Sequence, residues 1–180
     1  MLLFLLVSIY ILSEYNIMHL TGKRLILKSL TINEANSKYL SWLCDKEVTK
    51  YMFTKYYTLP QLVTYVNNKI NDKNCLFLGI FLGDEHIGNI KIESIDHQLK
   101  TGILGMMIGE KKYWNKGYGN EALSLLLNHM FIEKKWNKID LGVEKENINA
   151  ISLYKKNGFK FNGLTFNGIQ KDSALGMTLK

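Results

Sequence analysis

Residues 113–122 read Tyr-Trp-Asn-Lys-Gly-Tyr-Gly-Asn-Glu-Ala, and this stretch decides how the rest of the chain is interpreted. It follows an apolar run from Gly102 to Gly109 and opens a helical pattern that ends near Lys135. Two glycines one residue apart at the start of a helix permit a positive φ and let a ligand approach the backbone closely. The N–H groups of the first helical turn have no intrahelical partner and carry the positive end of the helix dipole. The stretch therefore predicts a strand, an anion-binding turn and a helix.

The length and charge of the chain limit the kind of protein it can be. With 180 residues, of which 47% are hydrophobic and 22% charged, it suits one soluble globular domain with a substantial core. The formal net charge of +7 favours an anionic partner such as a nucleotide. Because the lysines are scattered, with no run of five, we expect no nucleic-acid partner.

Cysteine and histidine usage gives no sign of a metal site or a disulfide framework. Cys44 and Cys75 lie far apart, so we interpret them as buried apolar side chains in a reducing cytoplasm, with a disulfide or a nucleophile as the alternatives. The four histidines share no metal-ligand spacing with these cysteines, and we therefore expect no metal.

The first residues form a separate feature. Residues 1–12 are almost wholly apolar, but they are fewer than the roughly 18–20 that a membrane-spanning helix needs. They also lack the charged start and the small-residue cleavage site of a signal peptide. Met18 stands directly before a clearer strand pattern, so we interpret residues 1–17 as an extension or a misassigned start, and residues 18–180 as the domain. An added strand, an added helix or a membrane contact is the alternative; we expect no stable membrane insertion.

From residue 24 onward, strand and helix patterns alternate. Apolar alternation and short apolar runs predict seven strands, over residues 24–30, 75–82, 87–95, 102–109, 138–144, 159–164 and 174–179. Capping boxes and helical spacing predict four helices, over residues 31–43, 58–71, 117–135 and 147–156. This order predicts an α/β protein in which helices cover the faces of a mixed sheet.

The glycine turn also fits a different class of protein. Gly117-x-Gly119-x-x-Ala122 matches the dinucleotide-binding fingerprint, and Asp140 follows about 20 residues later. In that fold the first glycine follows its strand almost at once, whereas here seven residues separate Gly109 from Gly117. The strands before the turn are linked as hairpins, so we disfavour the dinucleotide interpretation.

A second motif complements the first. Residues 143–159 read Val-Glu-Lys-Glu-Asn-Ile-Asn-Ala-Ile-Ser-Leu-Tyr-Lys-Lys-Asn-Gly-Phe, a strand end followed by a short helix capped by Asn147 and ended by Gly158. With both motifs the chain resembles the GNAT superfamily of acetyl-CoA-dependent N-acetyltransferases over roughly residues 20–180. The closer likeness is to the branch that includes ribosomal-protein N-terminal acetyltransferases. The resemblance implies a largely antiparallel, seven-stranded sheet with about four helices, and acetyl-CoA as co-substrate.

The resemblance implies roles for the residues that match the family motifs. The residues expected to bind the cofactor are Ile108, Lys116, Gly117, Tyr118, Gly119, Asn120, Asn149 and Tyr154. Asn149 matches the asparagine that contacts the pantetheine arm, although it could simply share helix capping with Asn147. Tyr154 matches the tyrosine that protonates the departing thiolate, a transfer that suits a phenol with a pKa near about 10. A core tyrosine is the alternative.

Other features of the family are less clear in this sequence. The backbone N–H that stabilises the oxyanion lies where one strand bulges and parts from the next, and Gly105 is the expected bulge. Trp114 stands where many members have Arg or Gln. The glutamate that many members of the branch carry is replaced by Ile103, so the general base is open between Glu93, Asp96, His97 and Glu144, or a water. We take Glu144 as the candidate.

The acceptor is expected to meet aromatic residues near the first two helices. Trp42, Tyr51 and Tyr57 are candidates for this surface, with ordinary packing as the alternative, and His97 is a further candidate. Residues 39–43 resemble a segment of acetyltransferases that act on amino-sugar nucleotides. We therefore expect a small-molecule or peptide amine, first an amino-sugar nucleotide and second a protein N-terminal α-amine, bound by a monomer or homodimer. A module that binds CoA without catalysis is a further alternative.

Overall fold

The computed structural model describes residues 18–52, 58–163 and 174–180. The predicted extension over residues 1–17 and the candidate Tyr57 lie outside these ranges. Within them, every helix is too short or too polar to cross a membrane.

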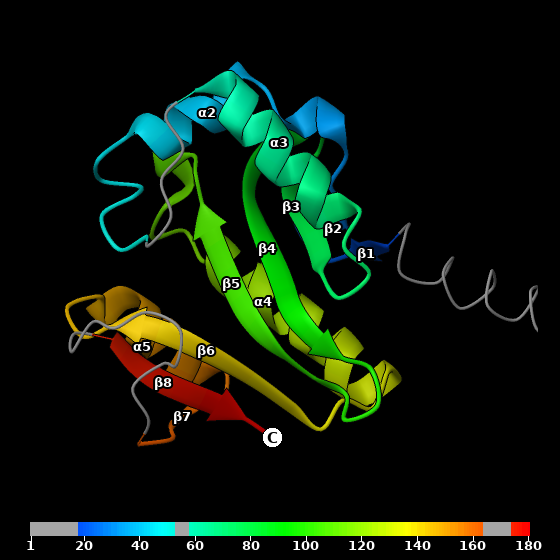
Figure 1. Ribbon diagram of the computed structural model, residues 1–180. Coiled ribbons are helices and arrows are strands. Elements are labelled where there is room, and N and C mark those ends of the chain that lie inside the picture. The colour runs from blue at the N-terminus through cyan, green and yellow to red at the C-terminus, as the bar shows by residue number, and fades with distance from the viewer. Residues whose placement is uncertain (1–17, 53–57, 164–173) are drawn as a thin grey trace, which may run out of the picture.

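One mixed sheet forms the body of the protein (Figure 1). Its strands are β1 (His19–Thr21), β2 (Ile26–Ser29), β3 (Leu76–Leu82), β4 (Glu85–Asp96), β5 (Thr101–Ile108), β6 (Lys138–Glu144), β7 (Lys160–Phe161) and β8 (Ala174–Leu179), in the spatial order β1-β2-β3-β4-β5-β6-β8-β7. Only β5 and β6 run parallel; all other neighbouring strands among the described residues are antiparallel. The α/β, largely antiparallel prediction is confirmed. Within the described part of the chain the sheet has eight strands instead of seven, because β1, too short to give a pattern, pairs with β2.

The helices begin where capping residues allow. They are α2 (Ser37–Cys44), α3 (Leu59–Ile70), α4 (Tyr118–Asn128) and α5 (Ile148–Lys156), with short turns η1 (Ile32–Glu34), η2 (Lys111–Tyr113) and the π-helical η3 (His129–Glu133). Both capping boxes form, at Thr31 and Thr58. The box at Thr31 caps only η1, however, because Asn36 provides a second cap from which α2 starts.

Two cores lie on opposite faces of the sheet. On one face α4 packs against β4 and β5 through fully buried side chains that include Leu123, Leu126 and Ile90. On the other face α2 and α3 cover β3 around a second cluster that includes Trp42 and Leu62 (Figure 1). The sheet is therefore enclosed on both sides in its first half.

The cysteines differ from the prediction. Cys44 is exposed, because it ends α2 on the side away from the buried Tyr39, Trp42 and Leu43. Cys75 is half-buried, and burial raises the pKa of its thiol to about 11. Both thiols are free, and the thiolate that a nucleophile requires is disfavoured at Cys75.

The sheet opens between β5 and β6, as Figure 1 shows. The two strands pair only over Thr101–Ile103 and Lys138–Asp140. Beyond that point β5 stays paired with β4, and β6 stays paired with β8, so the two strands diverge as a V. Beyond this point the sheet consists of two halves, one that ends at β5 and one that begins at β6.

The register shows which backbone groups of β5 face this opening. Gly109 donates its N–H to the Ile87 carbonyl on β4, at 2.9 Å. Hydrogen-bonded positions alternate along an antiparallel pair, so Leu104, Met106 and Ile108 direct their N–H groups away from β4 and toward the opening.

The predicted bulge at Gly105 is wrong. Gly105 pairs regularly with Lys91, and the register shift lies between Glu93 and Asp96 on β4. Ser94 takes up the extra residue there with a φ of 53°. Gly105 instead leaves room for a neighbouring side chain, since a Cβ there would lie 3.1 Å from Lys91 Cε.

Gly109→Ala is expected to destabilise the fold by about 1–3 kcal/mol, the usual cost of over-packing a filled site. A Cβ at Gly109 would lie 2.0 Å from Cδ2 of the buried Trp42 ring. The free energy of unfolding in urea measures the effect. Gly119→Ala is the matched control, since its Cβ would meet nothing closer than 3.7 Å and should cost no stability. A Gly109→Ala variant as stable as the wild type would contradict the packing argument.

Candidate active site

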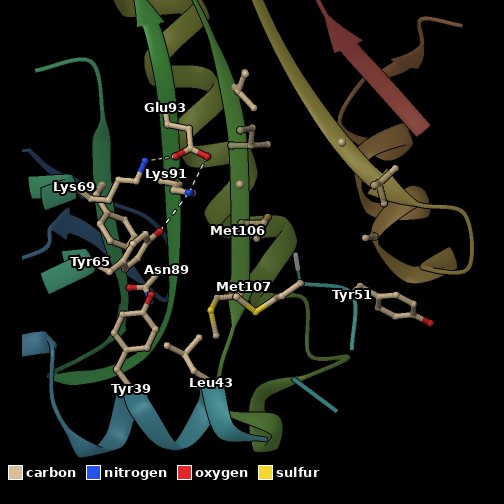
Figure 2. A pocket seen from close by; sticks show the side chains of 18 of the residues that line it. Tyr39, Leu43, Tyr51, Tyr65, Lys69, Asn89, Lys91, Glu93, Met106 and Met107 are labelled. Atoms are coloured by element: carbon tan, nitrogen blue, oxygen red, sulfur yellow. Dashed lines mark hydrogen bonds and ion pairs between the residues drawn. The ribbon is translucent and has the colours of Figure 1, made fainter. Parts of the chain in front are cut away.

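A cleft of about 980 Å³ lies beside the opening of the sheet, on the face that α2 and α3 cover (Figure 2). Side chains from α2 and α3 line one side of it, and β6 and α5 line the other. The middle strands contribute a row from β4 and a row from β5. Both predicted catalytic residues, Glu144 and Tyr154, belong to its lining.

Tyr154 lies on α5, with its ring 5.7 Å from that of Phe159 between centroids. Its side chain is 7% exposed, and burial raises the pKa of its phenol to about 12. The hydroxyl therefore remains protonated at neutral pH, as a proton donor must be. Glu144, at the end of β6, is also buried and shares the cleft with it.

The start of α4 forms the predicted turn. Gly117 is the residue before the helix and has a φ of 82°, the left-handed conformation that glycine adopts without strain. α2, α3 and α5 each have a side-chain cap, from Asn36, Thr58 and Asn147, whereas α4 has none. Its first-turn N–H groups are thus open to an anion.

This turn lies where β5 meets α5. A Cβ on Gly119 would be 3.7 Å from Met106 Cε, 3.8 Å from Ile108 Cγ1 and 3.8 Å from Leu153 Cδ2. The Asn120 side chain accepts a hydrogen bond from Asn157 Nδ2 at 3.1 Å, which joins α4 to the end of α5. The uncapped helix start therefore borders the opening of the sheet.

Trp114 joins the preceding loop to the end of β5. Its indole Nε1 donates to the Ile108 carbonyl at 2.8 Å, which is the side of β5 that faces away from β4. The indole N–H is therefore already hydrogen-bonded within the protein. The backbone carbonyl of Lys116, two residues later, accepts a hydrogen bond from a side chain that is distant in the sequence.

Arg24 is that side chain, and sequence analysis missed it. Its Nε lies 2.7 Å from Glu121 Oε2 in the first turn of α4, and its Nη1 donates to the Lys116 carbonyl at 3.1 Å. The guanidinium carbon lies 4.3 Å from the centre of the Tyr118 ring. A cation from the turn between β1 and β2 is therefore fixed over the glycine turn. No local pattern could reveal this, because the contact spans 97 residues.

Only some of the residues predicted to contact the acceptor lie in the cleft. Tyr51 lines the cleft, and its hydroxyl donates to the Glu146 carbonyl at 3.1 Å, so it joins the segment after α2 to the loop before α5. Trp42 is buried outside the cleft lining, against the backbone of Gly109. His97 lies in the exposed β4–β5 turn, where its Nε2 is 3.0 Å from the Lys73 carbonyl. The structure does not bring Trp42 or His97 into the cleft.

Two other predicted residues lie at element ends. Asn149 is exposed in the first turn of α5, while Asn147 provides the cap by accepting from the Ala150 N–H at 3.2 Å. Asp96 accepts two backbone N–H groups of its own turn, from Gln98 and Leu99. Asp96 is thus engaged outside the cleft lining.

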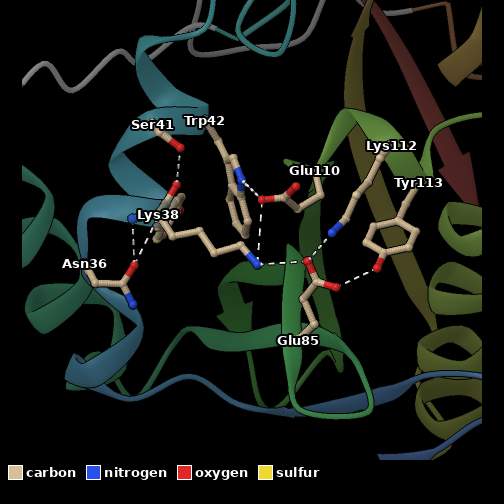
Figure 3. A network of polar contacts seen from close by, with 9 residues as sticks. Asn36, Lys38, Ser41, Trp42, Glu85, Glu110, Lys112 and Tyr113 are labelled. Carbon is tan, nitrogen blue, oxygen red and sulfur yellow. Dashed lines mark hydrogen bonds and ion pairs between the residues drawn. The ribbon is translucent and has the colours of Figure 1, made fainter.

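A polar network holds the loop that leads into the glycine turn (Figure 3). Glu85 accepts from Lys112 at 2.7 Å and from the Tyr113 hydroxyl, while Lys38 on α2 reaches it at 3.3 Å. Trp42 Nε1 donates to Glu110 at 2.9 Å on the other side of the network. The network joins η2 to α2 and to the β3–β4 hairpin.

Comparisons with known proteins agree with this geometry. The family described as acetyltransferase (GNAT) domain matches residues 24–160. The chain is 28% identical over 144 residues to the uncharacterized N-acetyltransferase p20 of Bacillus licheniformis, covering 77% of this chain and 80% of the relative. It is also 28% identical over 147 residues to the uncharacterized N-acetyltransferase YnaD of Bacillus subtilis, covering 79% and 83%.

Two solved structures share the fold at low sequence identity. RimL, a ribosomal L7/L12 alpha-N-protein acetyltransferase solved in complex with coenzyme A, has a TM-score of 0.78 and 11% identity, covering 90% of this chain and 97% of that chain. Spermidine N-acetyltransferase from Vibrio cholerae, in complex with CoA and spermine, has a TM-score of 0.76 and 19% identity, covering 88% and 96%.

Glu85→Gln is expected to reduce stability above pH 4.5 and to have no effect near pH 2. Hydrogen bonds from Lys112 and Tyr113 lower the pKa of the Glu85 carboxyl from 4.5 to about 2. Because the folded-state pKa is the lower one, the stabilisation is present above pH 4.5 and is lost as the pH falls toward 2. Solvent screens this site, so the difference should stay below about 1 kcal/mol. Urea unfolding of both proteins at several pH values measures it; a difference that persists at pH 2 would contradict the network.

Proposed function

Because the chain belongs to the GNAT acetyltransferase family, we propose that it transfers the acetyl group of acetyl-CoA directly to a primary amine. The chain is an acyltransferase by its family and its relatives. The observation that carries the proposal is the opening between β5 and β6, which borders the uncapped start of α4 and the cleft that holds Tyr154.

The residues around the opening suit the anionic and amide groups of coenzyme A. The N–H groups of Tyr118, Gly119 and Asn120 would bind the pyrophosphate, as the dipole at a helix start favours. Arg24 would add a guanidinium over the same turn, since Trp114 contributes no cation. The outward N–H groups of β5, including that of Ile108, would pair with the amides of the pantetheine arm. Asn149, in the first turn of α5, remains the proposed side-chain contact to this arm.

The chemistry would take place where the cleft meets the opening. The thioester supplies the acetyl carbonyl; Glu144 would accept the proton that the attacking amine gives up. An outward N–H of β5, at Leu104 or Met106, would donate to the oxyanion of the tetrahedral intermediate. Tyr154 would then donate its proton to the departing thiolate.

The acceptor would occupy the cleft, where Tyr51 lies. We propose a small anionic amine, for which an amino-sugar nucleotide is the leading class. A protein N-terminal α-amine is the second class, since the protein of similar fold solved with coenzyme A acts on a ribosomal protein.

Tyr154→Phe is expected to lower kcat at least about 10-fold, with KM for acetyl-CoA within about 2-fold, because only the proton donor is lost. Steady-state assays with a reactive amine and free-thiol detection measure this. Tyr113→Phe is the matched control: it also removes a tyrosine hydroxyl, but at the Glu85 network outside the cleft. An unchanged kcat in Tyr154→Phe would refute the role of this phenol.

Arg24→Gln is expected to weaken CoA binding about 10–100-fold, the value of a charge-assisted hydrogen bond. Binding of pantetheine, which has no pyrophosphate, should be unchanged. Titration calorimetry measures both dissociation constants, and Lys28→Gln, on β2, controls for the loss of one positive charge at another position. Because the variant also frees Glu121, the double variant Arg24→Gln/Glu121→Gln separates the lost donor from the released carboxylate. Equal losses for CoA and pantetheine would show that Arg24 acts only on the fold.

A further inference from the structure

A row of polar side chains stands on a part of the sheet that is otherwise apolar. Asn89, Lys91 and Glu93 alternate along β4 and line the cleft, facing α2 and α3 (Figure 2). The residues between them, Ile90 and Ile92, are fully buried in the opposite core. Burying polar groups on a central strand costs free energy unless these groups are hydrogen-bonded or paired. Such a row therefore suggests a function beyond packing.

Lys91 lies across β5 because Gly105 stands opposite it. A Cβ on Gly105 would be 3.1 Å from Lys91 Cε and 3.6 Å from its Cγ, so the absent side chain leaves room for the lysine stem. The ammonium group then contacts Glu93 at 2.8 Å and the Tyr65 hydroxyl at 3.3 Å. The glycine thus fixes the position of the charge in the cleft.

Lys69, from α3, contacts the same carboxylate at 2.6 Å. The cluster of Lys69, Lys91 and Glu93 therefore holds two positive charges and one negative charge. Its three side chains are only 21–27% exposed, so solvent screens this excess charge less than at an open surface. Burial opposes ionisation of Glu93, yet the two lysines hold its pKa below the usual range, and the pair of cations stays in excess.

Asn89 adds an unmet donor to the same wall. Its Oδ1 lies 2.9 Å from His86 Nε2, while its Nδ2 is buried and has no partner among the described residues. The residue is 3% exposed. Burial lowers the pKa of His86, so the imidazole adds no charge. An amide with one unpaired polar atom at a cleft wall is a group that a bound molecule can satisfy.

The opposite wall carries the reverse charge. Among the described residues that line this wall, Glu144 on β6 is the carboxylate, and it lies in the cleft with Tyr154. The cleft is therefore positive at its α3 and β4 wall and negative at its β6 and α5 wall. This distribution matches a molecule with an amine at one end and an anion at the other.

We propose that the cluster of Lys69, Lys91 and Glu93 binds an anionic group of the acceptor, a phosphate or a carboxylate, while the amine of the same molecule reaches Glu144. This inference rests on the proposed acetyl transfer and gives the chemical class of its acceptor. It excludes polyamines as preferred acceptors, because a second ammonium group would meet the excess positive charge of the cluster.

The test compares three amines as acceptors for the wild-type protein. They are an amino-sugar nucleoside diphosphate, an α-amino acid with a free carboxylate, and spermine. Lys91→Gln should raise KM for the preferred anionic amine at least 10-fold and leave KM for acetyl-CoA within 2-fold. Lys91→Glu should improve kcat/KM for spermine relative to the wild type. Which anionic amine is preferred identifies phosphate or carboxylate as the group bound.

Two further variants separate the effect of the position of the Lys91 side chain from the effect of losing one positive charge. Gly105→Ala keeps both lysines but moves the Lys91 stem, so it should also raise KM for the anionic amine, with kcat retained. Lys28→Gln removes one positive charge outside the cleft and should change neither constant. A preference of the wild type for spermine, or an unchanged KM in Lys91→Gln, would overturn the inference.

Direct binding distinguishes this inference from the proposed function. Uridine diphosphate is titrated by calorimetry into protein saturated with CoA, so that the turn at α4 is already occupied. A dissociation constant that rises at least 10-fold in Lys91→Gln supports the cluster as an anion site, and one that is unchanged refutes it. If CoA itself does not bind, the proposed function fails, and the titration into protein without CoA still decides whether Lys91 binds an anion.

Discussion

The structure depends on the short pairing between β5 and β6. These strands run parallel for three residues, and β6 then follows β8 while β5 follows β4. Backbone N–H and C=O groups in a protein interior need partners, and the part of β5 beyond Ile103 finds none on β6. The gap can stay open because each half of the sheet is held by its own antiparallel partner and its own helices. An extended molecule with amides can provide the missing partners.

The two motifs meet at this gap from different directions. The chain leaves β5 and passes through a loop held by Trp114 before α4 begins without a side-chain cap. The second motif returns along β6 and turns into α5, which brings Tyr154 to the cleft. The start of α4 lies beside both β5 and α5, since a Cβ on Gly119 would be within 3.8 Å of Met106, Ile108 and Leu153, and both motifs therefore share one site. Arg24, which lies outside both motifs, then adds its guanidinium group beside the start of α4.

The distribution of charge over the cleft also depends on how the strands pair. The register of β4 against β5 places Gly105 opposite Lys91, and the cover of α3 adds Lys69 to the same carboxylate. Each lysine alone would be an ordinary surface cation. Their common partner Glu93 gathers them at one wall of the cleft, opposite Glu144.

Local patterns in the sequence determined the elements and the two motifs, because caps, glycines and apolar periods act within a few residues. The positive φ of Gly117, the caps at Thr58 and Asn147, and the chain order of the predicted strands and helices could all be read this way. The predicted bulge at Gly105 is wrong because the role of this glycine depends on Lys91 from the neighbouring strand, which no local pattern shows. Only the tertiary structure decided that Arg24 lies over the turn, that Lys69 and Lys91 share Glu93, and that Trp42 and His97 lie outside the cleft. Such contacts join residues far apart in the chain, and no spacing within one segment encodes them.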